Sequence, residues 1–129
     1  MTYLLDVNVL VALGFERHEF HGRAVEWLRA ASRPRLASCA ITELGFVRVL
    51  SQAPAYGFTV AQARDSLLRL KKAVPIAQFI ADTHDISRLP AWARTPKQTT
   101  DGHLLELARD NGAVLATFDG KIPEAYCLG

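Results

Sequence analysis

Two acidic residues stand where buried strands are expected to end or to be interrupted. Asp6 lies inside the apolar run YLLDVNVLVAL, which extends from residue 3 to residue 13, and Asp119 directly follows the apolar run AVLATF. Runs of this kind are typical of strands that are buried on both faces of a parallel sheet. Each acid alone has an ordinary explanation, because Asp6 could cap a backbone turn and Asp119 could be a turn residue before Gly120. Acidic side chains in such apolar surroundings are nevertheless the first candidates for chemistry.

Two further acids, Glu43 and Asp101, each stand near the start of an amphipathic helix and point toward its apolar face. The residues three, four and seven positions later share that face, and all are apolar: Phe46, Val47 and Leu50 after Glu43, and Leu104, Leu105 and Ala108 after Asp101. We place both acids in the first helical turn, where the helix dipole stabilises a carboxylate. The dipole explains an acid at the start of a helix, but it does not explain why the acid faces inward.

Together the four acids predict a shared metal site. Two of them end or interrupt strands and two begin helices. In a parallel sheet both kinds of position lie at the carboxyl edge, because helices begin where strands end. Carboxylates that converge there repel one another and raise one another's pKa values, and a divalent cation relieves this repulsion. Oxygen ligands with partial hydration favour Mg²⁺ or Mn²⁺ over Zn²⁺.

Alternating strand and helix patterns supply the scaffold for these acids. We expect strands at residues 3–13, with a helical far end, and at 35–39, 76–81, 113–118 and 125–128, the last at a sheet edge. We expect helices at residues 23–31, 40–52, 59–74 and 85–93, and from Thr99 or Thr100 to Asp110. Ser38 is the expected N-cap of the helix at 40–52. The alternation predicts an α/β domain with a mainly parallel sheet.

Length and composition agree with one ordinary globular domain. The chain has 129 residues, of which 50% are hydrophobic and 22% charged, so a core can form and nothing indicates disorder. We therefore treat residues 1–129 as a single domain. The net charge of +2 neither requires nor opposes a nucleic-acid partner, because a local basic surface matters more than the total charge.

Features of targeting and oxidation favour a cytoplasmic protein. Cys39 and Cys127 have no CxxC spacing and are expected to be reduced thiols. Asp6 interrupts the N-terminal apolar stretch and no basic segment precedes it, so we expect no signal peptide. The apolar runs are shorter than the roughly 20 residues that a membrane-spanning helix needs, and we expect no membrane contact.

Three segments resemble the PIN domain and, within it, the VapC-type toxins. They are LLDVNVLVAL, ITELGFVRVL and TTDGHLLELARDNGAVLATFD, and the resemblance extends from Leu4 to about Asp119. It implies a three-layer α/β/α fold with a central, mainly parallel sheet of five strands. It also implies a Mg²⁺- or Mn²⁺-dependent endonuclease that acts on RNA, a cognate antitoxin protein and a homodimer.

The resemblance carries six functional positions onto this chain. They are the acids Asp6, Glu43, Asp101 and Asp119, with Asn8 and Thr117 as supporting polar residues. Asp6 and Asp101 are then the first choice of direct metal ligands, and the other two acids would bind that ion, a second ion or their waters. The metal would activate a water for attack on a phosphodiester bond. Asn8 and Thr117 would orient the carboxylates or the waters.

Several basic residues and histidines have two interpretations. Five basic residues could contact an RNA backbone, although each could equally be a solvated surface charge: Arg17, Arg48, Arg88, Arg94 and Lys97. His18 and His21 have a spacing that could mimic a metal-binding pair, but hydrogen bonding within their polar loop is favoured.

Two alternative functions use the same acids. One is a phosphatase of the haloacid-dehalogenase type with Asp6 as nucleophile, but Asn8 then stands where that chemistry needs an acid. The other is a non-cleaving RNA- or partner-binding module that contains the same acidic pocket. Cleavage of RNA and its dependence on Asp6 distinguish these alternatives from a ribonuclease.

Overall fold

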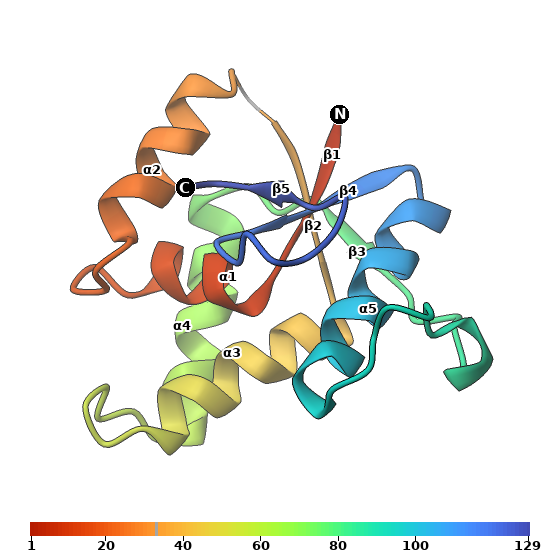
Figure 1. The fold of residues 1–129 in the computed structure, drawn as a ribbon. Coiled ribbons are helices and arrows are strands. Elements are labelled where there is room, and N and C mark those ends of the chain that lie inside the picture. Colours follow the sequence, from red (N-terminus) through yellow and green to blue (C-terminus); the bar gives the residue numbers. More distant parts are fainter. Residues whose placement is uncertain (33) are drawn as a thin grey trace.

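A parallel sheet passes through the middle of the molecule (Figure 1). The computed structural model describes residues 1–32 and 34–129. Within these residues the sheet has five strands: β1 (Thr2–Leu5), β2 (Arg35–Cys39), β3 (Gln78–Ile80), β4 (Ala113–Thr117) and β5 (Tyr126–Cys127). Their spatial order is β3-β2-β1-β4-β5, and every neighbouring pair is parallel.

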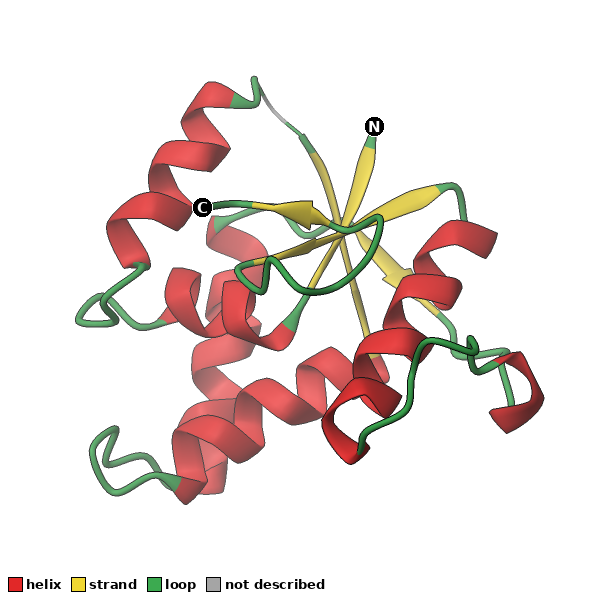
Figure 2. Cartoon of the chain, in the orientation of Figure 1, coloured by secondary structure: helices red, strands yellow, loops and turns green. Residues whose placement is uncertain are grey.

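Helices cover both faces of this sheet. They are α1 (Val7–Gly14), α2 (His21–Ala30), α3 (Ala40–Gln52), α4 (Val60–Ala73) and α5 (Pro96–Asp110), with a 3-10 turn, η1 (Ile86–Arg88). Figure 2 shows α1 to α4 gathered on one side of the yellow strands and α5 on the other. The expected three-layer α/β/α arrangement is confirmed.

Alternate residues of the central strands enter two different cores. Leu4 and Leu5 of β1 are both fully buried, yet Leu5 packs in the core beneath α1 to α4 whereas Leu4 packs in the core beneath α5. Leu115 and Ala116 of β4 divide in the same way. A side chain alternates from face to face along a strand, so a strand that is covered on both faces must be apolar throughout. This requirement explains the continuous apolar runs of the sequence.

The order of the strands creates a switch point between β1 and β4. The chain builds β1, β2 and β3 in one direction across the sheet and then crosses over through α5 to place β4 on the other side of β1. The chain leaves β1 for α1 on one face of the sheet, whereas α5, which leads into β4, covers the other face. In open α/β sheets such a point is where ligands bind.

Some expected element boundaries are correct and others are wrong. The bounds of β2 and α3 are as expected, and β5 forms at the sheet edge. The first strand ends at Leu5, because Asp6 caps a helix that begins at Val7. The helix expected over 85–93 is only the short turn η1, followed by Pro90.

Two expected helix caps are also wrong. Helix α5 begins at Pro96 rather than after Thr99 or Thr100, because Thr95 accepts a hydrogen bond from the Gln98 amide and proline is favourable in the first turn. Cys39, not Ser38, occupies the N-cap position of α3. Ser38 instead donates a hydrogen bond to an acid of α3.

The structure bears on two further sequence features. Within the described residues, none of the helices is long and apolar enough to span a membrane. Cys39 and Cys127 are both free thiols, the first buried and the second exposed.

Candidate active site

Asp6 lies where β1 passes into α1, so it is a helix cap and not part of the strand interior. One carboxylate oxygen accepts a hydrogen bond of 2.8 Å from the Val7 amide, and the other accepts one of 2.8 Å from the Thr117 hydroxyl. Only 7% of the residue is exposed. Burial raises the pKa of Asp6, and the two hydrogen bonds oppose this rise only in part.

Thr117, the last residue of β4, ties the ends of the two neighbouring strands together. Its fully buried hydroxyl donates to Asp6 and accepts hydrogen bonds from the Asn8 side-chain amide at 3.1 Å and the Asp119 backbone amide at 3.0 Å. The Asn8 side-chain oxygen accepts a bond from the Phe118 amide. Asn8 reaches this network from the first turn of α1.

Asp101 approaches the same point from the other face of the sheet. It lies in the second turn of α5, not in the first, because α5 begins at Pro96. Leu104, Leu105 and Ala108 are buried as expected, and Asp101 itself is half-buried. Burial raises its pKa, and so do the nearby charges of Asp6 and Asp119, whereas Lys97 lowers it. The three aspartates are therefore close enough to repel one another.

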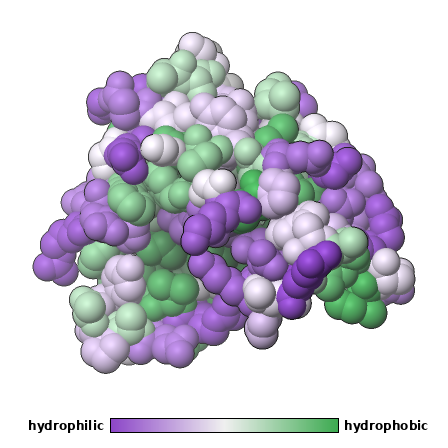
Figure 3. All heavy atoms as spheres, in the orientation of Figure 1, coloured by the Kyte–Doolittle hydropathy of each residue, from purple (hydrophilic) through white to green (hydrophobic). Residues whose placement is uncertain are grey.

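One cavity of about 480 Å³ is lined by Asp6, Asp101 and Asp119 together with Lys97. The Lys97 ammonium lies 4.0 Å from an Asp119 oxygen, and its side chain is 84% exposed, so this contact is a weak, solvated ion pair. The space-filling view in the same orientation as the ribbon shows hydrophilic and hydrophobic side chains next to one another over the middle of this face (Figure 3). The cavity combines these charged groups with apolar walls, because Val7, Val11 and Phe118 also line it.

Glu43 occupies different surroundings from the three aspartates. It lies in the first turn of α3, as expected, but α3 follows β2, one strand away from the switch point. One of its oxygens accepts hydrogen bonds from the Ser38 hydroxyl at 2.5 Å and the Lys71 ammonium of α4 at 2.7 Å. Among the described residues it does not line the cavity that contains the aspartates. The acids therefore divide into a group of three and one ion-paired glutamate.

The donor set of the three aspartates fits a hard divalent cation. Their donors are carboxylate oxygens, and burial together with the charges of neighbouring aspartates raises the pKa values of Asp6 and Asp101. In the described part of the chain, no three His, Cys, Asp or Glu side chains are already arranged to hold a metal ion. Mg²⁺ keeps several waters when bound and commonly uses one or two protein carboxylates with substrate phosphates.

The five basic residues with an expected RNA contact are in unlike positions. Lys97 lines the cavity beside Asp119. Arg88 is ion-paired with Asp110 at 2.6 Å, and the Arg17 guanidinium lies over the Phe15 ring. Arg48 and Arg94 are exposed to solvent.

His18, in the loop before α2, and His21, the first residue of α2, each make a hydrogen bond through the ring. The His18 ring accepts a bond from the Phe20 amide at 3.0 Å, and the His21 ring donates one to the Ala12 carbonyl at 2.7 Å. The favoured interpretation of loop hydrogen bonding is thus confirmed for His18, whereas His21 bonds to a carbonyl of α1.

Sequence reasoning missed the aromatic part of the cavity. Phe20, Tyr56 and Phe118 line it together with the aspartates, and they come from three separate segments of the chain. Phe118 could have been noticed because it stands between Thr117 and Asp119. No spacing in the sequence connects Phe20 or Tyr56 with the acids, since only the tertiary fold brings them together.

Comparison with known proteins assigns the family. The model of the PIN domain matches residues 3–126, which is nearly the whole chain. The chain belongs to the PIN-domain family. Its PIN-domain relatives include ribonuclease VapC38 of Mycobacterium tuberculosis, which is 39% identical over 92% of this chain and 86% of its own length. Ribonuclease VapC44 of the same organism is 40% identical over 95% of this chain and 89% of its own length.

A solved structure agrees on the fold of this PIN domain. It is VapBC2 of Rickettsia felis bound to a DNA fragment from its promoter, with a TM-score of 0.62 and 17% identity over 98% of this chain and 97% of that chain. Membership of the PIN-domain family also leaves the phosphatase alternative without support.

Proposed function

We propose that this PIN-domain protein is a Mg²⁺- or Mn²⁺-dependent endoribonuclease and acts as the toxin of a toxin–antitoxin pair. The observation that carries the proposal is the convergence of Asp6, Asp101 and Asp119 on one cavity, where burial and mutual repulsion raise the pKa of the first two. Relatives with 39% and 40% identity are named ribonucleases, which supports RNA as the substrate.

In this proposal Asp6 and Asp101 hold the cation, and Asp119 binds the same ion, a second ion or their waters. A bound divalent cation would supply a water of lowered pKa and neutralise charge that develops on the phosphoryl oxygens. Thr117 and Asn8 keep the carboxylate of Asp6 and the backbone of Asp119 in place, because their hydrogen bonds connect both strand ends. Together these residues orient the reacting groups.

Glu43 and the basic residues have separate proposed tasks. Glu43 acts on metal-bound waters or on a second ion, from a position that Ser38 and Lys71 hold. Lys97 contacts the RNA backbone, because it is the exposed cation beside Asp119. The other four basic residues would contribute to backbone binding farther from the acids.

The partners are also part of the proposal. The structural relative is a VapBC complex, which supports a cognate antitoxin for this chain. We further propose that the toxin is a cytoplasmic homodimer, as the resemblance to VapC-type toxins implies.

The direct test is cleavage of a labelled single-stranded RNA pool by the purified protein. We expect cleavage in Mg²⁺ or Mn²⁺, loss of cleavage in EDTA and its return when the metal is restored. Asp6→Asn should reduce the rate by at least about a hundredfold, because a metal ligand is lost. Cleavage that resists EDTA, or an unchanged rate in Asp6→Asn, contradicts the mechanism.

The same experiment separates the ribonuclease from the non-cleaving alternative. RNA that binds the wild-type protein and survives intact with either metal would support a binding module. Sequencing of RNA ends after brief expression, wild type against Asp101→Ala, would identify the RNA that is cut.

A further inference from the structure

Two cavities lie on either side of the Lys97–Asp119 contact. The larger, of about 480 Å³, and a smaller one of about 150 Å³ are both lined by Lys97, Asp101 and Asp119. The smaller cavity also has Trp92 and Lys121 in its walls. Asp101 and Asp119 therefore border two hollows, whereas Asp6 lines the larger one.

Aromatic rings form much of the wall of the larger cavity. The rings of Phe20 and Phe118 pack with their centroids 4.9 Å apart and their planes tilted by 32°. The ring of Tyr56 packs edge-on against Phe15, with centroids 4.7 Å apart. These neighbours hold the rings in place, so little side-chain entropy remains to be lost when a ligand packs against them.

We propose that the larger cavity is a nucleobase subsite, in which an unpaired base of the RNA packs against Tyr56, Phe20 and Phe118 while its phosphate lies over the aspartates. The smaller cavity, of about 150 Å³, then borders the nucleotide on the other side of the scissile phosphate. The inference rests on the proposed ribonuclease function and names the form of substrate, an unstacked single strand, that this site accepts.

The size and chemistry of the cavity favour a base over a bound ion or water alone. A volume of about 480 Å³ is within the range of roughly 300–1,000 Å³ found for small-molecule sites and far exceeds the needs of one cation. Every base has a flat π-face, so aromatic walls bind single strands with little regard to sequence. A base within a duplex presents only its edges, because both of its faces are already stacked.

The arrangement of charge favours a strand that crosses the aspartates. Lys97 borders both cavities and Lys121 borders the smaller one, so cations flank the position proposed for the phosphate. A single peptide side chain in the larger cavity would leave the smaller cavity and Lys121 without a role. A nucleotide chain occupies both, because its successive units repeat a base and a phosphate.

The test compares the binding of RNA with and without its central bases to proteins with and without the aromatic side chains of the cavity. The protein carries Asp101→Asn so that RNA stays intact, and the probes are a fluorescein-labelled mixed-sequence RNA hexamer and the same hexamer with two abasic central positions. In Mg²⁺ we expect the bases to strengthen binding by about tenfold to a hundredfold, the size of one base–aromatic stack. Adding Tyr56→Ala or Phe118→Leu should remove most of this difference. Tyr56→Phe should preserve it, because the ring remains.

Controls separate this effect from unfolding and from other occupants. Phe79→Ala, which removes an aromatic ring that is 54% exposed on the edge strand β3, should leave the difference unchanged. The base subsite is overturned if the protein without aromatic substitutions binds both hexamers equally. It is also overturned if Tyr56→Ala and Phe118→Leu both leave the difference between the hexamers undiminished. Either result favours a protein segment as the occupant. If the wild-type protein cleaves no RNA, but Tyr56→Ala and Phe118→Leu still abolish the difference between the two hexamers, the nuclease function is refuted and the base subsite is retained.

Discussion

Two aspartates of α5 lie in opposite electrostatic surroundings. Asp101, in the second turn, has burial and the charges of Asp6 and Asp119 to raise its pKa. Asp110, the last residue of the helix, has a lowered pKa, chiefly because the Arg88 guanidinium donates to it at 2.6 Å, with a further bond of 2.8 Å from the His84 ring. The same residue type on the same helix is neutralised at one end and left uncompensated at the other.

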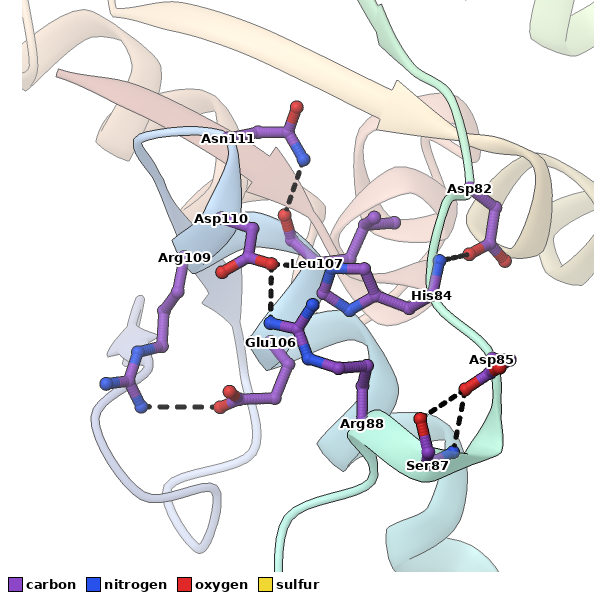
Figure 4. Close-up of polar contacts among 10 residues, drawn as sticks. All are labelled: Asp82, His84, Asp85, Ser87, Arg88, Glu106, Leu107, Arg109, Asp110 and Asn111. Atoms are coloured by element: carbon purple, nitrogen blue, oxygen red, sulfur yellow. Dashed lines mark hydrogen bonds and ion pairs between the residues drawn. The ribbon is translucent and has the colours of Figure 1, made fainter.

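The neutralised end forms a polar network that connects the β3–α5 segment to the helix (Figure 4). His84, whose side chain is only 2% exposed, contacts Asp110, and the His103 ring of α5 pairs with Asp82 at 3.0 Å. Asp85 caps η1 by accepting bonds from Ser87. Each acid here has a partner within the protein, so this network is structural.

The uncompensated end has the properties of a functional site. Bringing like charges together costs free energy of folding, and a fold retains such an arrangement where an external ligand relieves it. The contrast between Asp101 and Asp110 therefore distinguishes an acid whose ionisation burial and neighbouring acids oppose from one that is already paired with Arg88.

The largest expected effect is on RNA cleavage. Asp101→Asn should lower the cleavage rate by at least about a hundredfold, since it removes a proposed metal ligand. Asp110→Asn, the matched change at the other end of α5, should keep the rate within about twofold of wild type, because only a structural ion pair is lost. Initial rates in Mg²⁺ measure both. Equal losses in the two variants would erase the distinction between the two ends of the helix.

A smaller effect is expected from Thr117→Val, which keeps the shape of the side chain and removes its hydroxyl. Asp6 loses a donor and the Asp119 amide loses an acceptor, so the cleavage rate should fall by about tenfold to a hundredfold. Thr117→Ser retains the hydroxyl and should recover most of the activity. A metal titration of the rate should show a weaker apparent metal affinity in Thr117→Val alone; an unchanged metal dependence argues against an orienting role.

The next effect concerns the two cations near the ends of α5. Lys97→Ala should weaken RNA binding by a few-fold and reduce the slope of log affinity against log salt by roughly 0.7, since one phosphate contact on a single strand is lost. Arg88→Ala should change the slope less, because Arg88 is already paired with Asp110. Fluorescence anisotropy with labelled RNA across a salt series gives both slopes. A larger change in Arg88→Ala would assign the RNA path to the opposite end of the helix.

The smallest effect is on stability and its pH dependence in metal-free buffer. The folded-state pKa of Asp101 is raised, so its ionisation destabilises the fold at neutral pH, and this penalty disappears as pH falls below the ordinary aspartate range. Asp101→Asn should therefore be more stable than wild type at pH 7 and equal to it in acid. The pKa of Asp110 is lowered, so Asp110→Asn should be less stable at pH 7, and the difference should shrink as pH falls through that lowered pKa. The urea midpoints of unfolding of both variants and of wild type, measured across pH, test these expectations. A midpoint of Asp101→Asn below that of wild type at pH 7 contradicts the proposed difference between Asp101 and Asp110.

Local sequence patterns predicted most of the helices and strands. They failed where several residues could cap the same helix. The bounds of α3 were predictable because a clear apolar periodicity follows the short strand and ends before Pro54. The start of α5 was not, because Thr99 and Thr100 resemble caps as closely as Thr95 does. Pro96 and Gln98 decide in favour of Thr95, and they move Asp101 into the second turn.

The sequence predicted the kind of site, but only some of the residues that form it. The inward direction of Asp101 and the position of Asp119 at a strand end followed from periodicity and from the geometry of parallel sheets. Asp6 was expected inside a strand and instead caps α1. The ion pair of Glu43 with Lys71 did not, because the two residues are 28 positions apart and meet only when α3 packs against α4.

By itself the sequence determined a parallel α/β fold with acids at the carboxyl edge of its sheet, because side-chain periodicity and helix starts are local properties of the chain. The tertiary structure alone decided which acids meet. β4 pairs with β1, which brings Thr117 to Asp6 across 111 positions of sequence, while Glu43 follows β2, on the far side of β1 from β4. Strand order depends on long-range packing on both faces of the sheet, and that packing also brings the aromatic rings of three separate segments to the aspartates.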